Sequence, residues 1–172
     1  MGIKEKIARK RLLRIEKEIC RIPELPNLNL VKNIGVLCQP GQTEAFKYLQ
    51  DYFGKTETTL SSLCVYDENI ELITEPHIIP KDLNWLGFPK SGMVDSFVEM
   101  NFDILFNIAL KHNVIFDYIM LVSKAKFKVG GQADLANYFD LNINIGQNQN
   151  SLYLVEQQIF YLSNLKQDKI NE

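Results

Sequence analysis

Residues 33–54, NIGVLCQPGQTEAFKYLQDYFG, combine a strand, a turn and a helix in one short stretch. Asn33–Cys38 is an apolar run of strand-forming residues, which predicts a buried first strand. The Gln-Pro-Gly that follows is typical of a turn. From Thr43, a candidate N-cap, the spacing of apolar residues predicts a helix that ends near Gly54. A strand followed at once by a helix is the repeating unit of α/β proteins.

The rest of the chain continues this alternation of strands and helices. Four more strands are predicted at residues 62–66, 102–109, 126–129 and 139–145, and residues 70–74 are a further candidate. Helices are predicted between them at residues 91–100, 113–122 and 151–166. Strands that alternate with helices favour a parallel sheet covered on both faces. We therefore expect an α/β fold with a single doubly wound, mostly parallel five-stranded sheet of the flavodoxin or Rossmann type.

The N-terminal segment predicts a separate amphipathic helix. Along residues 2–22, apolar residues recur every three or four positions on one stripe: Ala8, Leu12, Ile15, Ile19 and Ile22. Pro23 and Pro26 then end the helix. The expected organisation is a basic amphipathic helix at 1–22, a linker at 23–30, an α/β domain at 31–166 and a frayed tail at 167–172.

Charge is unevenly distributed between this helix and the domain. Residues 1–21 hold eight basic and three acidic residues, a net charge of +5, whereas the remainder carries −7. This asymmetry favours contact with an anionic partner, either RNA or the ribosome, or a membrane surface. The candidate partner-binding residues are Lys6, Arg9, Lys10, Arg14 and Lys17. The alternative is a structural helix that packs on the acidic body through its apolar stripe while its cations are solvated.

Three alternating lysines precede a Gly-Gly pair around the strand predicted at 126–129. Lys124, Lys126 and Lys128 would share one face of this strand, and Phe127 would pack on the other. Ammonium groups are not buried without partners, which leaves two interpretations. Either the lysines protect an edge strand from pairing, or they bind an anion together with the open backbone at Gly130.

Polar residues at strand ends and in one loop form a second set of candidates. Asp82, Asn84 and Trp85 lie in a proline-flanked loop, where the indole either anchors the loop to the core or forms a recognition platform. Asn107 lies near the carboxyl end of a strand, where open α/β sheets bind ligands, or its amide ties down the next loop. Asp140 lies on the polar face of the last strand. We expect these five residues at the ligand-binding edge of the sheet.

Several classes of function have no motif in the chain. Dinucleotide-binding, phosphate-loop, serine-hydrolase and zinc-protease patterns are absent, so we predict no catalytic residue, no metal and no cofactor. Cys38 and Cys64 lie in apolar runs, which favours buried thiols over a redox pair on neighbouring strands. No signal peptide and no apolar run long enough to cross a bilayer is found, so we expect a cytoplasmic protein.

Four sequence elements resemble a small uncharacterised bacterial family. They are Asp82-Leu83-Asn84-Trp85-x-Gly87-x-Pro89-Lys90, Phe102-Asp103-x-Leu105-x-Asn107, Ser123-x-Ala125-Lys126-Phe127-Lys128-Val129-Gly130 and Phe139-Asp140-Leu141. The resemblance covers the whole chain, with Phe139 where the family has tyrosine. It implies a bacterial cytoplasmic protein with a domain of unknown function, and it supplies no mechanism.

Two functions are compatible with these observations. The first is a non-catalytic binding or adaptor protein whose basic helix contacts an anionic partner. The alternative is a small enzyme that acts on a phosphorylated or nucleotide-like ligand at the carboxyl edge of the sheet. The adaptor is favoured because no general base can be identified from the sequence.

Overall fold

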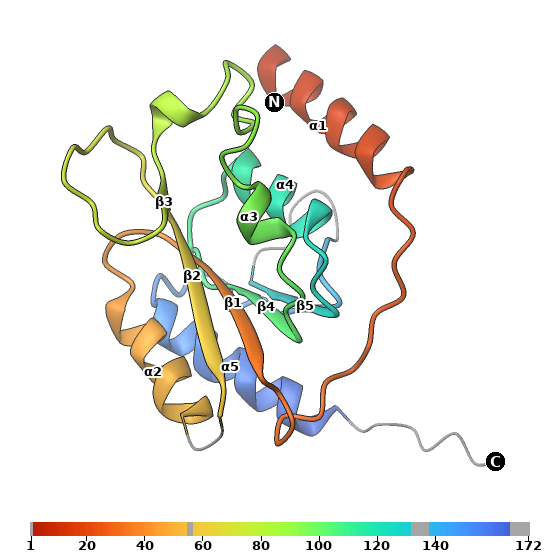
Figure 1. The fold of residues 1–172 in the computed structure, drawn as a ribbon, viewed down its shortest axis with the longest axis vertical. Coiled ribbons are helices and arrows are strands. Elements are labelled where there is room, and N and C mark those ends of the chain that lie inside the picture. Colours follow the sequence, from red (N-terminus) through yellow and green to blue (C-terminus); the bar gives the residue numbers. More distant parts are fainter. Residues whose placement is uncertain (1, 55–56, 132–137, 166–172) are drawn as a thin grey trace.

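A computed structural model describes residues 2–54, 57–131 and 138–165 of the chain. A single parallel sheet forms the centre of the molecule (Figure 1). Its strand order is β3-β2-β1-β4-β5-β6, and every neighbouring pair is parallel. This is the order of the Rossmann fold. The strands are β1 (Asn33–Cys38), β2 (Thr59–Val65), β3 (His77–Ile78), β4 (Ile104–Asn107), β5 (Phe127–Gly130) and β6 (Leu141–Asn142). The predicted α/β fold with one parallel sheet is confirmed.

The number of strands was predicted wrongly, because the sheet has six strands rather than five. The additional strand, β3, is two residues long and pairs with the end of β2 at Cys64 and Val65. Two residues are too few to show any hydrophobic period. Residues 70–74, the further candidate, form no strand, and β6 occupies only two residues of the predicted 139–145.

Helices cover both faces of the sheet (Figure 1). On one face lie α2 and α5, and on the other lie α1, α3 and α4. Successive strand residues point to opposite layers, so Ile34 and Val36 pack beneath α2 and α5 whereas Leu37 packs beneath α4. The helices are α1 (Ile3–Glu16), α2 (Thr43–Phe53), α3 (Asp95–Val98), α4 (Val114–Val122) and α5 (Ser151–Asn164), with a 3₁₀ turn, η1 (Pro80–Asp82).

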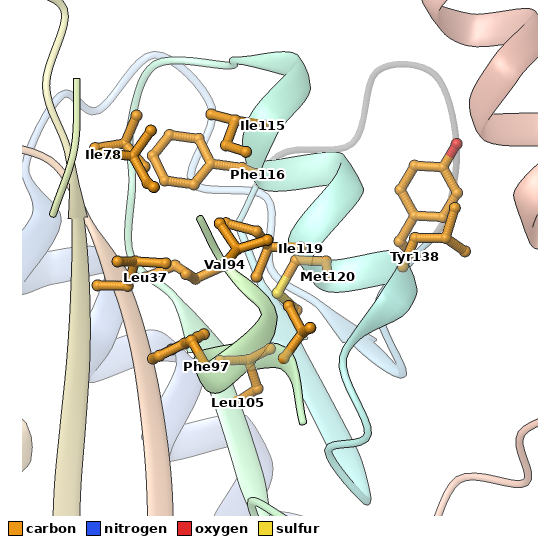
Figure 2. Packing of buried hydrophobic residues seen from close by; sticks show 14 of the residues in the cluster. Leu37, Ile78, Val94, Phe97, Leu105, Ile115, Phe116, Ile119, Met120 and Tyr138 are labelled. Atoms are coloured by element: carbon orange, nitrogen blue, oxygen red, sulfur yellow. The ribbon is translucent and has the colours of Figure 1, made fainter. Parts of the chain in front are cut away.

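The layer beneath α4 is closely packed (Figure 2). Phe116 and Ile119 of α4 lie over Leu37 and Leu105 of the sheet. Gly35 makes this packing possible, because a Cβ atom there would lie 2.7 Å from Leu105 and 2.8 Å from Phe102. No side chain larger than hydrogen fits at this point of β1 without moving the layer above it.

The N-terminal helix is shorter than predicted, and it is docked. It ends at Glu16 instead of residue 22, and both Ile19 and Ile22 are exposed. Ala8 and Leu12 are buried in the same core cluster as α4. Beyond the helix the chain runs without regular structure toward β1 (Figure 1). Pro23 restricts only Ile22, the residue directly before it, so it does not explain the end at Glu16.

Among the described residues, no helix has both the length and the apolar composition that a membrane crossing requires. The tail predicted at 167–172 lies outside the described residues.

Candidate functional site

The docked helix α1 turns most of its predicted partner-binding residues toward solvent. Lys6, Lys10, Arg14 and Lys17 are exposed and follow one another at steps of four, four and three, which places them on one stripe. Within the described part of the chain, no ion pair engages these four side chains. We call them the basic stripe. Arg9, the fifth predicted residue, is instead partly buried and lines a pocket between α1 and α4.

Specific contacts orient the basic stripe. The buried residues Ala8 and Leu12 hold α1 against α4. The guanidinium carbon of Arg11 lies 4.7 Å from the centre of the Phe88 ring, which is the geometry of a cation–π contact. The Phe88 ring in turn meets the ring of Tyr118 on α4 edge-on, with centroids 5.6 Å apart. The outward direction of the stripe therefore follows from the packing of the opposite face.

The ammonium groups of the three predicted anion-binding lysines do not converge on one point. Each ammonium group has a different partner: Glu99 for Lys124, Asp103 for Lys126 at 2.8 Å, and the carbonyl of Leu121 for Lys128 at 3.2 Å. The alternative interpretation, edge protection, also fails, because β5 lies between β4 and β6. Lys124 and Lys126 precede the strand, and only Lys128 lies within it.

Lys128 and Asp140 belong to a buried charged group that the sequence did not reveal. Burial, the largest cause, and the nearby cation Arg21 together lower the pKa of Lys128 to about 8, although Asp140 opposes the shift. The Arg21 guanidinium donates to both oxygens of Asp140, at 2.6 and 2.7 Å. Asp140 also accepts from the backbone nitrogen of Lys128 at 2.8 Å. Asp140 thus lies at the amino end of β6, rather than at the predicted carboxyl edge.

The backbone at Gly130 is covered. A Cβ atom at this position would lie 2.2 Å from the ring of Phe139. The aromatic ring therefore packs directly on the glycine, and the open anion-binding backbone that we predicted there is filled by a side chain of the protein itself.

The predicted loop residues have two different environments. Asp82 accepts from the backbone nitrogen of Ile79 at 3.0 Å, and Asn84 accepts from those of Leu86 and Phe88 at 2.9 and 3.2 Å. Both side chains shape the turn. Trp85 is 68% exposed, so it does not anchor the loop to the core. The exposure excludes the first interpretation, and the recognition platform stays a prediction.

Amide side chains close the carboxyl edge of the sheet, where the strand order reverses between β1 and β4. Asn107 accepts from the backbone nitrogen of Ala109 at 3.0 Å, so its amide ties down the following loop. Gln42 donates to the carbonyl of Ile108 at 2.9 Å, and the Gln39 side-chain oxygen accepts from the backbone nitrogens of Leu110 and Lys111. Outside these amides lies a hollow of about 530 Å³, which we call the edge hollow.

A pocket of about 540 Å³ lies between α1 and the start of α4, and we call it the helix pocket. Its walls come from four separate segments: Lys4, Glu5, Ala8, Arg9 and Leu12; Leu86 and Gly87; His112, Asn113, Val114 and Asp117; and Tyr138. At the start of α4, Nε2 of His112 lies 2.7 Å from Oδ2 of Asp117. Sequence reasoning missed this pocket because no spacing pattern connects the four segments.

Cys38 and Cys64 are aligned directly across β1 and β2. A hydrogen bond between the two thiols lowers the pKa of Cys64 and raises that of Cys38. The two strands thus bring both cysteines together, although the sequence shows no paired spacing. In the described ranges, no three His, Cys, Asp or Glu side chains gather as a metal site requires.

Comparison with known proteins gives one match. Neither the curated proteins nor the solved structures include a significant match to this chain. One family model, described as "Family of unknown function (DUF6913)", matches residues 4–165. The match spans α1, the whole sheet and α5, which confirms the resemblance to a family without an assigned activity. The chain belongs to the family of unknown function DUF6913.

Proposed function

We propose that this chain is a non-catalytic adaptor of the cytoplasm that binds RNA, on the ribosome or elsewhere, through the basic stripe of α1. One observation carries the proposal: docking buries Ala8 and Leu12 of α1, while Lys6, Lys10, Arg14 and Lys17 are all exposed on one stripe. The stripe runs from Lys6 to Lys17, eleven steps of the chain, which corresponds to about 16 Å along the helix axis. Phosphates follow one another every few ångströms along a strand, so a stripe of this length can meet several of them.

The docked position favours RNA over a membrane surface. An interfacial helix binds a bilayer by inserting its apolar face among the lipids. In α1, Ala8 and Leu12 are already buried against the protein body, and the apolar residues that stay exposed, Ile3, Ile7 and Leu13, form no face separate from the basic stripe. The four cations of the basic stripe can still attract phosphates, and electrostatic attraction of this kind is enough to bind a nucleic-acid backbone.

The test compares matched charge variants at different salt concentrations. The first variant carries Lys6→Gln, Lys10→Gln, Arg14→Gln and Lys17→Gln. The control loses the same charge elsewhere on the surface, through Lys32→Gln, Lys47→Gln, Lys81→Gln and Lys111→Gln. Binding to purified ribosomes and to a labelled RNA hairpin is measured by co-sedimentation and fluorescence anisotropy, with vesicles of anionic lipid as a third arm.

Four phosphate contacts predict that log K falls with log salt at a slope of about −3 to −4 for RNA. The stripe variant should lose most of this affinity and most of the slope, and the control variant should keep both. Equal binding by both variants, or binding to the vesicles alone, would exclude the RNA adaptor.

A second candidate is the small enzyme or binding protein for a phosphorylated or nucleotide-like ligand. The edge hollow favours it, because α/β sheets bind ligands where the strand order reverses. It has less support, because Asp82, Asn107 and Asp140 all accept hydrogen bonds from backbone groups and do not line this hollow.

A further inference from the structure

Cys38 and Cys64 form a pair of free thiols across two neighbouring strands. The two residues are directly aligned in the parallel register of β1 and β2, so both side chains point to the same face of the sheet. Sγ of Cys38 lies 3.9 Å from the carbonyl oxygen of Leu63, the residue before Cys64, and this thiol therefore turns toward β2. The strand register thus makes the two sulfur atoms neighbours.

The spacing of the sheet brings the two cysteines within reach of a disulfide. Neighbouring strands lie about 4.8 Å apart, and the Cα atoms of disulfide-bonded cysteines are usually about 4.4–6.8 Å apart. The Cβ atoms of a disulfide are closer, at about 3.8 Å, so side chains that stand parallel on the sheet have to approach each other. A disulfide can therefore form here without moving a strand, but it is strained. Strain makes a disulfide easy to reduce.

Cys64 is the more reactive thiol of the pair. The hydrogen bond with Cys38 is the largest influence and lowers the pKa of Cys64, and Tyr66 acts in the same direction, although burial opposes both. The same thiol–thiol hydrogen bond, together with burial, raises the pKa of Cys38. Because the thiolate is the form that an oxidant attacks, oxidation begins at Cys64, beside a thiol that still holds its proton.

The pair lies at the carboxyl end of β1, near the surface. Cys38 is the last residue of this strand and is partly exposed, whereas Cys64 is 7% exposed. Gln39 and Tyr66, which follow the two cysteines closely in the chain, line the edge hollow. A molecule as small as hydrogen peroxide can therefore approach the pair from this side.

We propose that Cys38 and Cys64 are a reversible disulfide site, which hydrogen peroxide oxidises and a small thiol such as glutathione reduces. The site is separate from the basic stripe, because neither cysteine lies in α1. It therefore does not depend on the RNA adaptor proposed above.

The oxidation has two steps. The Cys64 thiolate attacks one oxygen of the peroxide, the O–O bond breaks, and a sulfenic acid forms, while the other oxygen takes a proton from solvent and leaves as water. The Cys38 sulfur then attacks the Cys64 sulfur. The S–S bond forms, the S–O bond breaks, and the hydroxyl group leaves with the Cys38 proton as a second water. The peroxide gains two electrons, and the thiol pair loses them. Two glutathione thiols reverse this by exchange and become glutathione disulfide.

Peptide mapping of the full chain tests whether the disulfide forms. Protein treated with peroxide is unfolded in urea, alkylated with iodoacetamide and digested with trypsin. The expected product links residues 33–47 to residues 56–81, while Cys20, which is exposed, is alkylated. Glutathione at millimolar concentration should restore alkylation of both linked cysteines. Three alkylated cysteines after peroxide, a sulfinic acid at Cys64 without the link, or a link that resists glutathione would overturn the proposal.

The rate of linkage tests whether the folded sheet holds the thiols together. The folded chain should form the link at least about tenfold faster than the chain in urea, because alignment raises the effective concentration of one sulfur at the other. A link that forms only in urea would show that the fold keeps the cysteines apart. This measurement uses the original sequence, so it does not depend on the folding of a variant.

Three matched serine variants test the assigned roles. Cys20→Ser should keep the link, and both Cys38→Ser and Cys64→Ser should abolish it. In Cys38→Ser, whose hydroxyl can still donate a hydrogen bond, the sulfenic acid should persist at Cys64 and react with dimedone. Cys64→Ser should show no such label at Cys38. Loss of the link in Cys20→Ser, or a dimedone label at Cys38 alone, would contradict the proposed pair or the order of its steps.

Discussion

Lys128 places an ammonium group in the interior of the molecule, where it is 2% exposed and donates to the carbonyl of Leu121. Burial lowers its pKa from 10.5 to about 8. The unfolded chain therefore keeps this proton up to a higher pH than the folded chain does. Between about pH 8 and pH 10.5 the unfolded state binds more protons, so this residue makes the free energy of unfolding rise with pH across that window. Below pH 8 the cost of burying the charge is present in full.

Replacing the buried cation should stabilise the protein at neutral pH. We expect Lys128→Met to raise the free energy of unfolding at pH 7 by about 1–3 kcal/mol, because an apolar isostere avoids desolvation of the charge. The rise between pH 8 and pH 10.5 should disappear at the same time. Urea denaturation at pH 7 and pH 9.5 measures both effects. Lys126→Met, at an exposed lysine beside Asp103, is the control and should retain the rise. A Lys128→Met protein that is less stable at pH 7 would show that the fold requires the cation.

The spacing of the lysines in residues 124–128 could be recognised in the sequence, but their partners could not. Spacing determines which face of a strand a side chain occupies. It does not identify an acidic group more than twenty positions away, such as Asp103 for Lys126, or Asp140 for Arg21 at the opposite end of the chain. The acidic partners of Lys124 and Lys126 are therefore recognised only in the folded structure.

Two adjacent leucines of α1 differ in burial, and comparing them tests whether the helix packs on α4. Leu12 is 3% exposed and Leu13 is 41% exposed. We expect Leu12→Ala to lower the free energy of unfolding by about 2–4 kcal/mol, as for other buried leucines. Leu13→Ala, with the same change in composition and helix propensity, should cost less than about 1 kcal/mol. Equal effects of the two substitutions in urea denaturation would mean that α1 is not packed on α4 in solution.

Elements with a long and regular pattern were predicted well, and short or tertiary-determined ones were not. β1 and α2 follow the strand-turn-helix stretch at residues 33–54 closely, since apolar periodicity and turn residues agree there. β3 depends on pairing with β2. The end of α1 follows no local pattern either: beyond Glu16 the chain leaves the helical path that Ile19 and Ile22 suggested, and Arg21 meets Asp140.

The architecture of the whole molecule could be predicted from alternating elements, but its pockets could not. A parallel sheet between two helical layers follows from the order of strands and helices. The helix pocket exists because α1 crosses over α4, and this docking brings Arg9 near Tyr138. No periodicity within either segment contains that information, so this site becomes visible only in three dimensions.

Residues 31–166 were predicted from the sequence to form a domain of their own, and truncation tests whether they fold without α1. A chain that begins at residue 23 lacks α1 and also Arg21. It exposes the surface beneath Leu12 and leaves the mostly buried Asp140 without its guanidinium partner. Lost burial of about 2–3 kcal/mol and a mostly buried carboxylate left without its partner, about 1–3 kcal/mol, together predict a loss of about 3–6 kcal/mol. A loss of this size is a large part of the stability of an ordinary domain.

Two further chains separate the contributions. A chain that begins at residue 17 lacks the helix but retains Arg21, so its stability should lie between that of the 23–172 chain and that of the full chain. The four-glutamine variant of the basic stripe retains the packing, and it should unfold at nearly the same urea concentration as the original protein. If the 23–172 chain matches the full chain in urea denaturation, α1 and Arg21 contribute nothing to the fold, and the helix is an appendage of an autonomous domain. If it loses the predicted stability, α1 is part of the body, and the basic stripe is held on a rigid surface.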